Sequence, residues 1–234
     1  MSKLLLKDGH LTLRAALYLS ALLISIGMGF SAKFVGNFLQ KAMDGEFVVA
    51  CAILFKVIGL GMTYMQRSPL MLRWISENFT KFIIVMDVGF FILALIGQDF
   101  PMTRYVGYEL ICIVGVKLLK AVQRDNLNNC INGTAKSIFE AKVDSIAFVG
   151  AVGGGVAMLV ISRFVEVGVN AAMIVECLCC LGGHWLQRYV NYRIVELGIY
   201  RKEKVTFIEA FNQVCKSHKN KKISKDEDDT IFDQ

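Results

Sequence analysis

Charged side chains lie inside long apolar stretches of this sequence, where an ionised group is costly. Such residues either form a path for a proton, ion or polar substrate, or form buried ion pairs. Lys56, Asp87 and Glu176 lie deepest in their apolar runs, and Lys33 lies nearer the end of its run. We therefore treat these four as candidate residues of a substrate or ion pathway. For the three deep residues, the pathway and the structural ion pair remain open alternatives.

The other ionisable residues of the apolar runs lie closer to the ends of those runs. They are Lys81, Glu109, Lys117, Asp144 and His184. Interfacial ion pairs, and lysine side chains that reach toward water, account for them without a functional role. His184 precedes Trp185 near an inner boundary where aromatic belts form, and a proton relay there is the minor alternative.

The sequence offers no other constellation for catalysis or metal binding. It contains no phosphate-binding loop, protease signature or nucleophile elbow. Two of the three residues Cys177, Cys179 and Cys180 face different sides of a helix, and no paired His or Cys set completes a ligand cluster. We expect no enzymatic activity, no metal and no cofactor.

The composition predicts a membrane protein. The chain has 234 residues, of which 55% are hydrophobic and 20% charged. Its net charge of +6 is spread over the ends of apolar runs, so we expect the lipid bilayer as a partner and no nucleic acid. A spanning helix needs about 20 mainly apolar residues. Six stretches qualify: 13–39, 47–65, 70–97, 105–122, 138–161 and 169–190.

Short connections between these stretches predict an all-α up-and-down bundle of six transmembrane helices. Connections that are rich in Lys and Arg alternate along the chain with connections that are poor in them. The rich segments are the N-terminus, the connections near residues 66–69 and 123–137, and the C-terminal end. The positive-inside rule then places both termini in the cytoplasm, and the chain in the inner or plasma membrane as a multi-pass protein.

Three segments follow from this pattern: an N-terminal segment 1–12, a six-helix domain 13–190 and a cytoplasmic segment 191–234. Within the last, residues 201–216 predict an amphipathic helix, because Val205, Ile208, Phe211 and Val214 recur at spacings of three. The charged residues that follow predict disorder.

Glycines gather in the fifth apolar stretch, at Gly150, Gly153, Gly154 and Gly155. Small residues let transmembrane helices approach each other closely, so we expect these four positions to serve helix packing.

Three segments resemble a known family. The first apolar run contains Gly27 and Gly29, a short basic loop runs from Arg67 to Arg73, and Gly115 through Arg124 leads into the glycine-rich stretch 141–155. This pattern is similar to the N-terminal six-helix half of a major facilitator superfamily (MFS) transporter. The sequence departs from the family pattern after Gly61, where the Asp and second Gly are missing, and in its fifth stretch, which lacks Pro.

The resemblance implies alternating access between two six-helix bundles around a midplane site. One such chain supplies one bundle, so the likeness implies a homo-oligomer or another membrane protein as partner, moving a small solute. Asp87 or Glu176 would be the proton- or cation-linked carboxylate, and Lys56 its counter-charge. The alternative is a non-transporting accessory, immunity, exclusion or scaffold protein that binds a membrane partner.

Overall fold

A computed structural model shows a helical protein with several helices long and apolar enough to cross a membrane. It describes residues 6–7, 10–42, 45–96, 101–130, 134–196 and 205–216. The side chain of Lys33 and the charged tail 217–234, for which disorder was expected, lie outside the described residues.

Six long helices make up most of the described chain, in sequence order. A two-residue strand pair precedes them, with Leu6 opposite Leu11. A shorter helix over residues 207–216 follows them. The elements are β1 (Leu6–Lys7), β2 (His10–Leu11), α2 (Leu13–Ala42), α3 (Gly45–Met65), α4 (Pro69–Ile96), α5 (Pro101–Cys130), α6 (Thr134–Ile161) and α7 (Val169–Glu196).

The starts of several helices have a local chemical cause. The Thr12 hydroxyl accepts a hydrogen bond from the Ala15 amide at 3.2 Å and caps α2. Ser68 caps α4 in the same way through the Met71 amide at 3.3 Å, and Pro69 follows at the first helical position. Pro101 begins α5 for the same reason. Backbone chemistry thus divides one long apolar sequence into separate helices.

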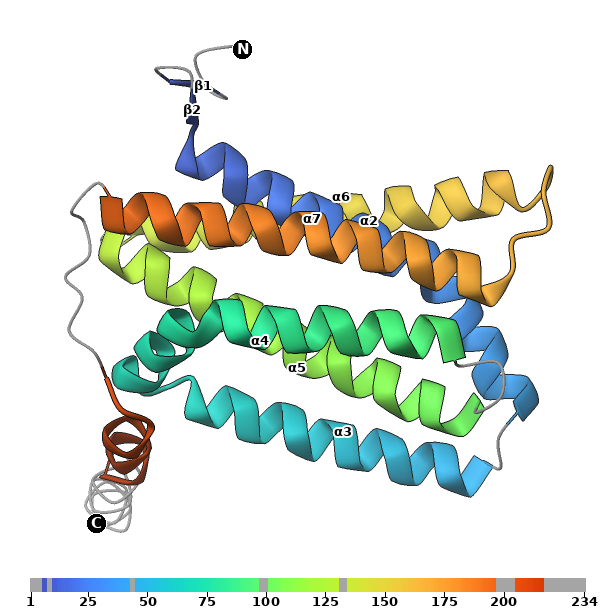
Figure 1. Cartoon of the computed structure of the whole chain (residues 1–234), viewed down its shortest axis with the longest axis horizontal. Coiled ribbons are helices and arrows are strands. Elements are labelled where there is room, and N and C mark those ends of the chain that lie inside the picture. The colour runs from blue at the N-terminus through green and yellow to red at the C-terminus, as the bar shows by residue number, and fades with distance from the viewer. Residues whose placement is uncertain are drawn as a thin grey trace, which may run out of the picture.

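The helices form two layers (Figure 1). Helix α2 lies between α6 and α7 and packs closely on both. Helices α4 and α5 pack on each other, and α4 also contacts α7. Helix α3 lies outermost, against α5. The face of α7 that meets α4 and α5 is therefore an interface inside the bundle.

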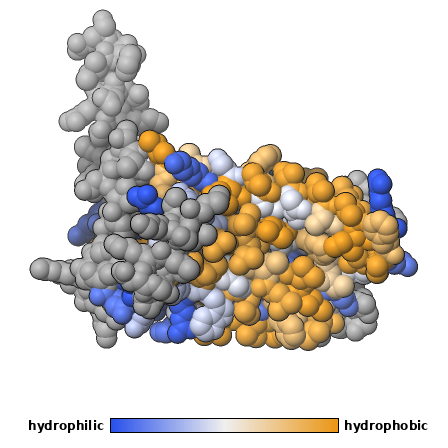
Figure 2. Space-filling view, turned by 90° about the horizontal axis from the view of Figure 1, so that it is seen from above, coloured by the Kyte–Doolittle hydropathy of each residue, from blue (hydrophilic) through white to orange (hydrophobic). Residues whose placement is uncertain are grey.

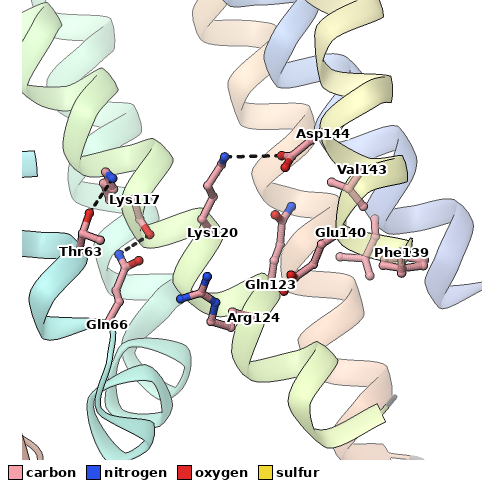
Figure 3. A pocket seen from close by; sticks show the side chains of 11 residues that line it. Thr63, Gln66, Lys117, Lys120, Gln123, Arg124, Phe139, Glu140, Val143 and Asp144 are labelled. Atoms are coloured by element: carbon pink, nitrogen blue, oxygen red, sulfur yellow. Dashed lines mark hydrogen bonds and ion pairs between the residues drawn. The ribbon is translucent and has the colours of Figure 1, made fainter. Parts of the chain in front are cut away.

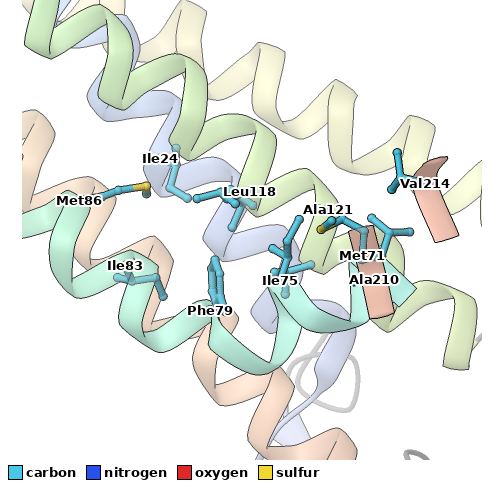
Figure 4. Close-up of a cluster of buried hydrophobic side chains, with 13 residues drawn as sticks. Ile24, Met71, Ile75, Phe79, Ile83, Met86, Leu118, Ala121, Ala210 and Val214 are labelled. Atoms are coloured by element: carbon cyan, nitrogen blue, oxygen red, sulfur yellow. The ribbon is translucent and has the colours of Figure 1, made fainter. Parts of the chain in front are cut away.

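The largest apolar core lies between α4 and α5 and includes Ile24 of α2 (Figure 4). Phe79 and Met71 of α4 are among its fully buried side chains. A second cluster joins α2, α6 and α7 around Leu17 and Phe139. Helix α2 thus contributes side chains to both cores, which connects the two layers.

The outer surface of the bundle is apolar. Figure 2 shows hydrophobic side chains over the middle of the bundle and hydrophilic ones toward its two ends. Helices α3 and α6 bury only 12% and 17% of their most apolar windows, so most of their aliphatic side chains face outward. An exposed apolar surface of this extent is compatible with a multi-pass membrane protein.

Five of the long helices are apolar enough to span a membrane: α2, α3, α4, α6 and α7. Helix α5 is as long but is not among them. The predicted fourth span, residues 105–122, carries Glu109, Lys117 and Lys120, which lower its hydropathy. Six helices are therefore long enough to span a membrane, as expected, but only five of the described helices are also apolar enough.

The helix over residues 207–216 packs against the start of α4. Thr206 and Glu209 form a reciprocal capping box, in which the Glu209 carboxylate accepts from the Thr206 amide at 2.9 Å. These bonds lower the pKa of Glu209. Ala210 and Val214 are buried in the α4–α5 core. The Gln213 side-chain oxygen accepts a hydrogen bond from the Leu70 amide at 3.0 Å, so this segment completes the cap of α4.

Val214→Asp is expected to detach this helix from α4, because burying an unpaired carboxylate costs several kcal/mol. The measurement is hydrogen exchange of the amides of residues 205–216 in detergent, where loss of protection is expected. Asn212→Asp adds the same charge on the exposed side of the helix and should leave protection unchanged. Unchanged protection in Val214→Asp would show that the packing does not hold the helix in place.

Candidate functional site: the polar stripe of α7

One face of α7 carries polar side chains along most of its length. Asn170, Glu176, His184, Gln187 and Asn191 lie within about a third of the helix circumference, because a helix has 3.6 residues per turn. We call these five residues the α7 polar stripe. Glu176, His184 and Gln187 are buried, and Asn170 and Asn191 are half-buried. At 1.5 Å per residue the stripe extends about 30 Å, which matches the thickness of a bilayer core.

Glu176 is completely buried, with a relative exposure of 0%. The Tyr108 hydroxyl of α5 donates to its carboxylate, at 3.0 Å from Oε2 and 3.1 Å from Oε1. Ser31 of α2 places its hydroxyl 3.1 Å from that of Tyr108. Three helices thus meet around one carboxyl group. Tyrosine and serine hydroxyls can both donate and accept, so the cluster can adjust to either protonation state of Glu176.

His184 pairs with Asp87 of α4 across the interface between the layers. Its Nδ1 lies 2.8 Å from Oδ1 of Asp87, and both side chains are almost fully buried. Side chains on a helix lean toward its N-terminus, so on α4 and α7, which run in opposite directions (Figure 1), these two side chains lean in opposite directions along the bundle. A neutral imidazole can donate through one ring nitrogen and accept through the other, which makes this pair a candidate proton relay.

Each end of the stripe has a partner on α5. Arg104 is buried near the start of α5 and donates to Asn170 Oδ1 at 2.6 Å. Near the other end of the same helix, Asn126 donates to the side-chain oxygen of Asn191. Because α5 and α7 run in the same direction, the two asparagines of α7 are held at opposite ends of the bundle.

Gln187 lies between His184 and Asn191 on the stripe and has a relative exposure of 0%. Neither its amide nitrogen nor its oxygen has a hydrogen-bond partner among the described residues. A buried amide without partners is costly, at about 1–3 kcal/mol per group. Its amide nitrogen and oxygen can therefore still donate and accept hydrogen bonds at this point of the stripe.

The structure brings together two of the four predicted pathway residues at one interface: Glu176 is on the stripe, and Asp87 contacts it through His184. Lys56 is exposed on α3 and lines a groove of about 460 Å³ with Glu109 and Lys117. The structure does not place Lys56 beside Asp87 or Glu176 as their expected counter-charge, because the closer contacts of α3 are with α5 and not with α4 or α7.

The predicted glycines face different surroundings. A side chain at Gly150 would meet the backbone oxygen of Leu22 at 2.9 Å, and one at Gly154 would collide with the backbone oxygen of Ile26. A side chain at Gly153 would meet nothing within 4 Å, and one at Gly155 would lie 3.7 Å from the Gly29 oxygen. Gly150 and Gly154 therefore face α2, while Gly153 faces outward.

The sequence predicted no site role for Tyr108, Ser31 or Gln187, and a minor one for His184. The spacing of Glu176, His184 and Gln187 does predict that these three stripe residues share one face of an otherwise apolar helix. No sequence signal assigns Tyr108 or Ser31 to this face, because their approach depends on how three helices pack.

No group of three His, Cys, Asp or Glu side chains that could hold a metal ion occurs among the described residues. Cys177, Cys179 and Cys180 lie on the same helix as the stripe, as free thiols. The site is therefore built from carboxyl, imidazole, hydroxyl and amide groups, whose chemistry is hydrogen bonding and proton transfer.

Asp125 lies on α5 just beyond the apolar part of that helix, and it is buried against α4. Burial raises its pKa to about 6, although a hydrogen bond with Ser76 and the charge of Arg73 act in the opposite direction. The folded state then binds a proton more tightly than the unfolded state does. Stability is therefore greatest below about pH 4 for this group, falls as the pH rises to about 6, and stays lower above it.

Asp125→Asn is expected to remove this loss of stability. Between pH 4.5 and 7.5 the wild type should lose about 1–2 kcal/mol more stability than the variant, after allowing for solvent screening. The measurement is the thermal unfolding midpoint in detergent at both pH values. Asp144→Asn, at an exposed carboxylate on α6, is the matched control. Equal pH dependence of Asp125→Asn and the wild type would contradict the burial argument.

Comparison with known proteins identifies no relative: the chain matches no protein-family model, no curated protein and no solved structure. The likeness to one half of an MFS transporter stays a prediction from the sequence.

Proposed function

We propose that this protein is an integral membrane transporter in which the α7 polar stripe carries a proton that is coupled to the movement of a small solute. The observation that carries the proposal is the completely buried Glu176, held by Tyr108, on the same helix face as the His184–Asp87 pair. Ionisable residues inside a membrane are rare and characteristic of substrate and proton pathways.

In this proposal all six long helices cross the membrane, including α5. The charges of α5 fit this arrangement in part, because Arg104 pairs inward with α7 and Lys117 donates to Thr63 of α3 at 2.7 Å. The excess of Lys and Arg at one end of the bundle supports cytoplasmic termini and an inner or plasma membrane location.

The resemblance to one half of an MFS transporter implies a second six-helix bundle. Two six-helix bundles are needed for alternating access, so a homodimer or a related membrane protein would complete the carrier. The open surface at Gly153 on α6 supports close approach of a second bundle at that helix.

The test of the proton path is proton movement into proteoliposomes that contain a trapped pH-sensitive dye. A potassium gradient with valinomycin sets the membrane potential, and liposomes without protein give the background. Acidification above background is expected for the wild type. Native mass spectrometry of the same preparation would establish whether one bundle or two are present.

The second candidate is a non-transporting accessory or scaffold protein. One observation favours it: both deep carboxylates already have partners within the chain, Tyr108 for Glu176 and His184 for Asp87. Closed pairs of this kind are also found where polar groups only hold helices together. Wild-type flux equal to that of empty liposomes, together with co-purification of a different membrane protein, would favour this candidate.

A further inference from the structure

A cleft of about 190 Å³ lies away from the α7 polar stripe, between α2, α3, α5 and α6. Its volume is far above the roughly 10–15 Å³ that one water molecule needs. Figure 3 shows α5 and α6 side by side, with Lys120 and Gln123 of α5 facing Asp144 and Glu140 of α6, while Lys117 and Arg124 lie on the side of α5 toward Thr63 and Gln66. The cleft is open to the surroundings, because the side chains of Lys120 and Asp144 are 58% and 66% exposed.

The positive and negative side chains of the cleft come from different helices. Lys117, Lys120 and Arg124 come from α5, at spacings of three and four that place them on one helix face. Glu140 and Asp144 come from α6, also four residues apart. The lining therefore presents cations on one side and carboxylates on the other.

Part of this charge has no partner among the residues that the structure describes. Lys117 donates to Thr63, and Lys120 lies 3.5 Å from Asp144 in an exposed and therefore weak ion pair. Arg124 and Glu140 have neither a hydrogen-bond partner nor an ion-pair partner among the described residues. One free cation, on α5, and one free carboxylate, on α6, thus line the same cleft.

The inner surface of the cleft is apolar. Leu17, Phe139 and Val143 line it and are buried in the α2–α6–α7 core. Ile138, Phe148 and Val149 of α6 are exposed on the outer surface of the same helix. A ligand with a charged end and an apolar end would therefore find both kinds of surface here.

We propose that this cleft binds a zwitterionic group that carries a phosphate and a primary ammonium, of the phosphoethanolamine class. The phosphate lies against Arg124 and the lysines of α5, since guanidinium groups bind phosphate through two parallel hydrogen bonds. The ammonium lies against Glu140 and Asp144, to which its three N–H groups donate. Basic pockets between transmembrane helices on the cytoplasmic side are known to bind the phosphates of anionic lipid headgroups.

The test uses detergent-purified, delipidated protein and native mass spectrometry with phosphatidylethanolamine, phosphatidylcholine and phosphatidylglycerol of the same acyl chains. The wild type is expected to retain phosphatidylethanolamine at least about fivefold better than either of the other lipids. Phosphatidylcholine has the phosphate, but its quaternary ammonium has no N–H to donate. Phosphatidylglycerol has the phosphate and no cation.

Two variants separate the roles of α5 and α6. Arg124→Gln is expected to weaken retention of all three lipids at least about fivefold, because it removes the free phosphate ligand. Glu140→Gln is expected to abolish the preference for phosphatidylethanolamine over phosphatidylcholine while retaining phosphatidylglycerol. Lys142→Gln removes a charge from an exposed position of α6 that does not line the cleft, and should behave as the wild type. Thermal unfolding midpoints check that each variant remains folded.

Free phosphoethanolamine distinguishes the two sources of this group. If it raises the unfolding midpoint of the wild type but not of Arg124→Gln, and no lipid is retained selectively, the site is supported with a soluble ligand. Equal retention of the three lipids by the wild type, without stabilisation by free phosphoethanolamine, would overturn the proposal. Preference for phosphatidylglycerol would overturn it as well, since that result requires only cations.

Discussion

Glu176→Gln is expected to lower proton flux into proteoliposomes about tenfold or more while leaving the protein folded. Glutamine has nearly the same shape, and its side-chain oxygen still accepts the hydrogen bond from Tyr108. The variant cannot release and rebind a proton, so a pathway that passes through this carboxyl group is interrupted. The initial rate of acidification, corrected for empty liposomes and protein content, is the quantity to compare.

The matched control is Glu109→Gln. Glu109 lies one position from Tyr108 along α5, but it lines the outer groove against α3 instead of the stripe. It should transport at the wild-type rate. Tyr108→Phe should fall between the two, because it keeps the ring and removes the hydroxyl that donates to Glu176.

A different outcome would assign Glu176 to structure. If Glu176→Gln transports at the wild-type rate and lowers the unfolding midpoint, the carboxyl group holds α2, α5 and α7 together and carries no proton. Wild-type rates for both Glu176→Gln and Asp87→Asn would exclude the stripe as the proton path even if the protein transports.

Gly154→Ala is expected to have the largest effect on stability of a single added methyl group in α6. The new Cβ would collide with the backbone oxygen of Ile26 and lie 3.0 Å from the backbone nitrogen of Phe30. Backbone atoms cannot rotate away as a side chain does, so α2 and α6 must separate. Overpacking of this kind costs about 1–3 kcal/mol, and a loss of several degrees in the unfolding midpoint is expected.

Gly153→Ala is the control from the adjacent position. Nothing lies within 4 Å of a Cβ there, and alanine favours a helix over glycine by up to about 1 kcal/mol. This variant should therefore be as stable as the wild type or slightly more stable. Equal destabilisation by both substitutions would mean that the effect does not come from the α2–α6 packing.

The helices themselves could be predicted from the sequence with small errors at their ends. The expected stretches 47–65, 70–97 and 138–161 correspond to helices Gly45–Met65, Pro69–Ile96 and Thr134–Ile161. The ends shifted outward where polar residues continue a helix beyond its apolar part, as in α5, which ends at Cys130. Apolarity marks the part of a helix that suits a bilayer, whereas hydrogen bonding and capping decide where the helix stops.

The sequence by itself determined that long apolar helices dominate this protein, and that Asp87 and Glu176 lie deep within two of them. Only the tertiary structure decided that Asp87 meets His184, that Tyr108 reaches Glu176, and that Lys56 faces outward. The physical reason is that lipid and helix interior are both apolar, so the two faces of a spanning helix differ little in composition. The position of a residue within an apolar run predicts its depth in a membrane. The direction in which its side chain points around the helix depends on how the helices pack, here at the glycines where α2 meets α6 and α7.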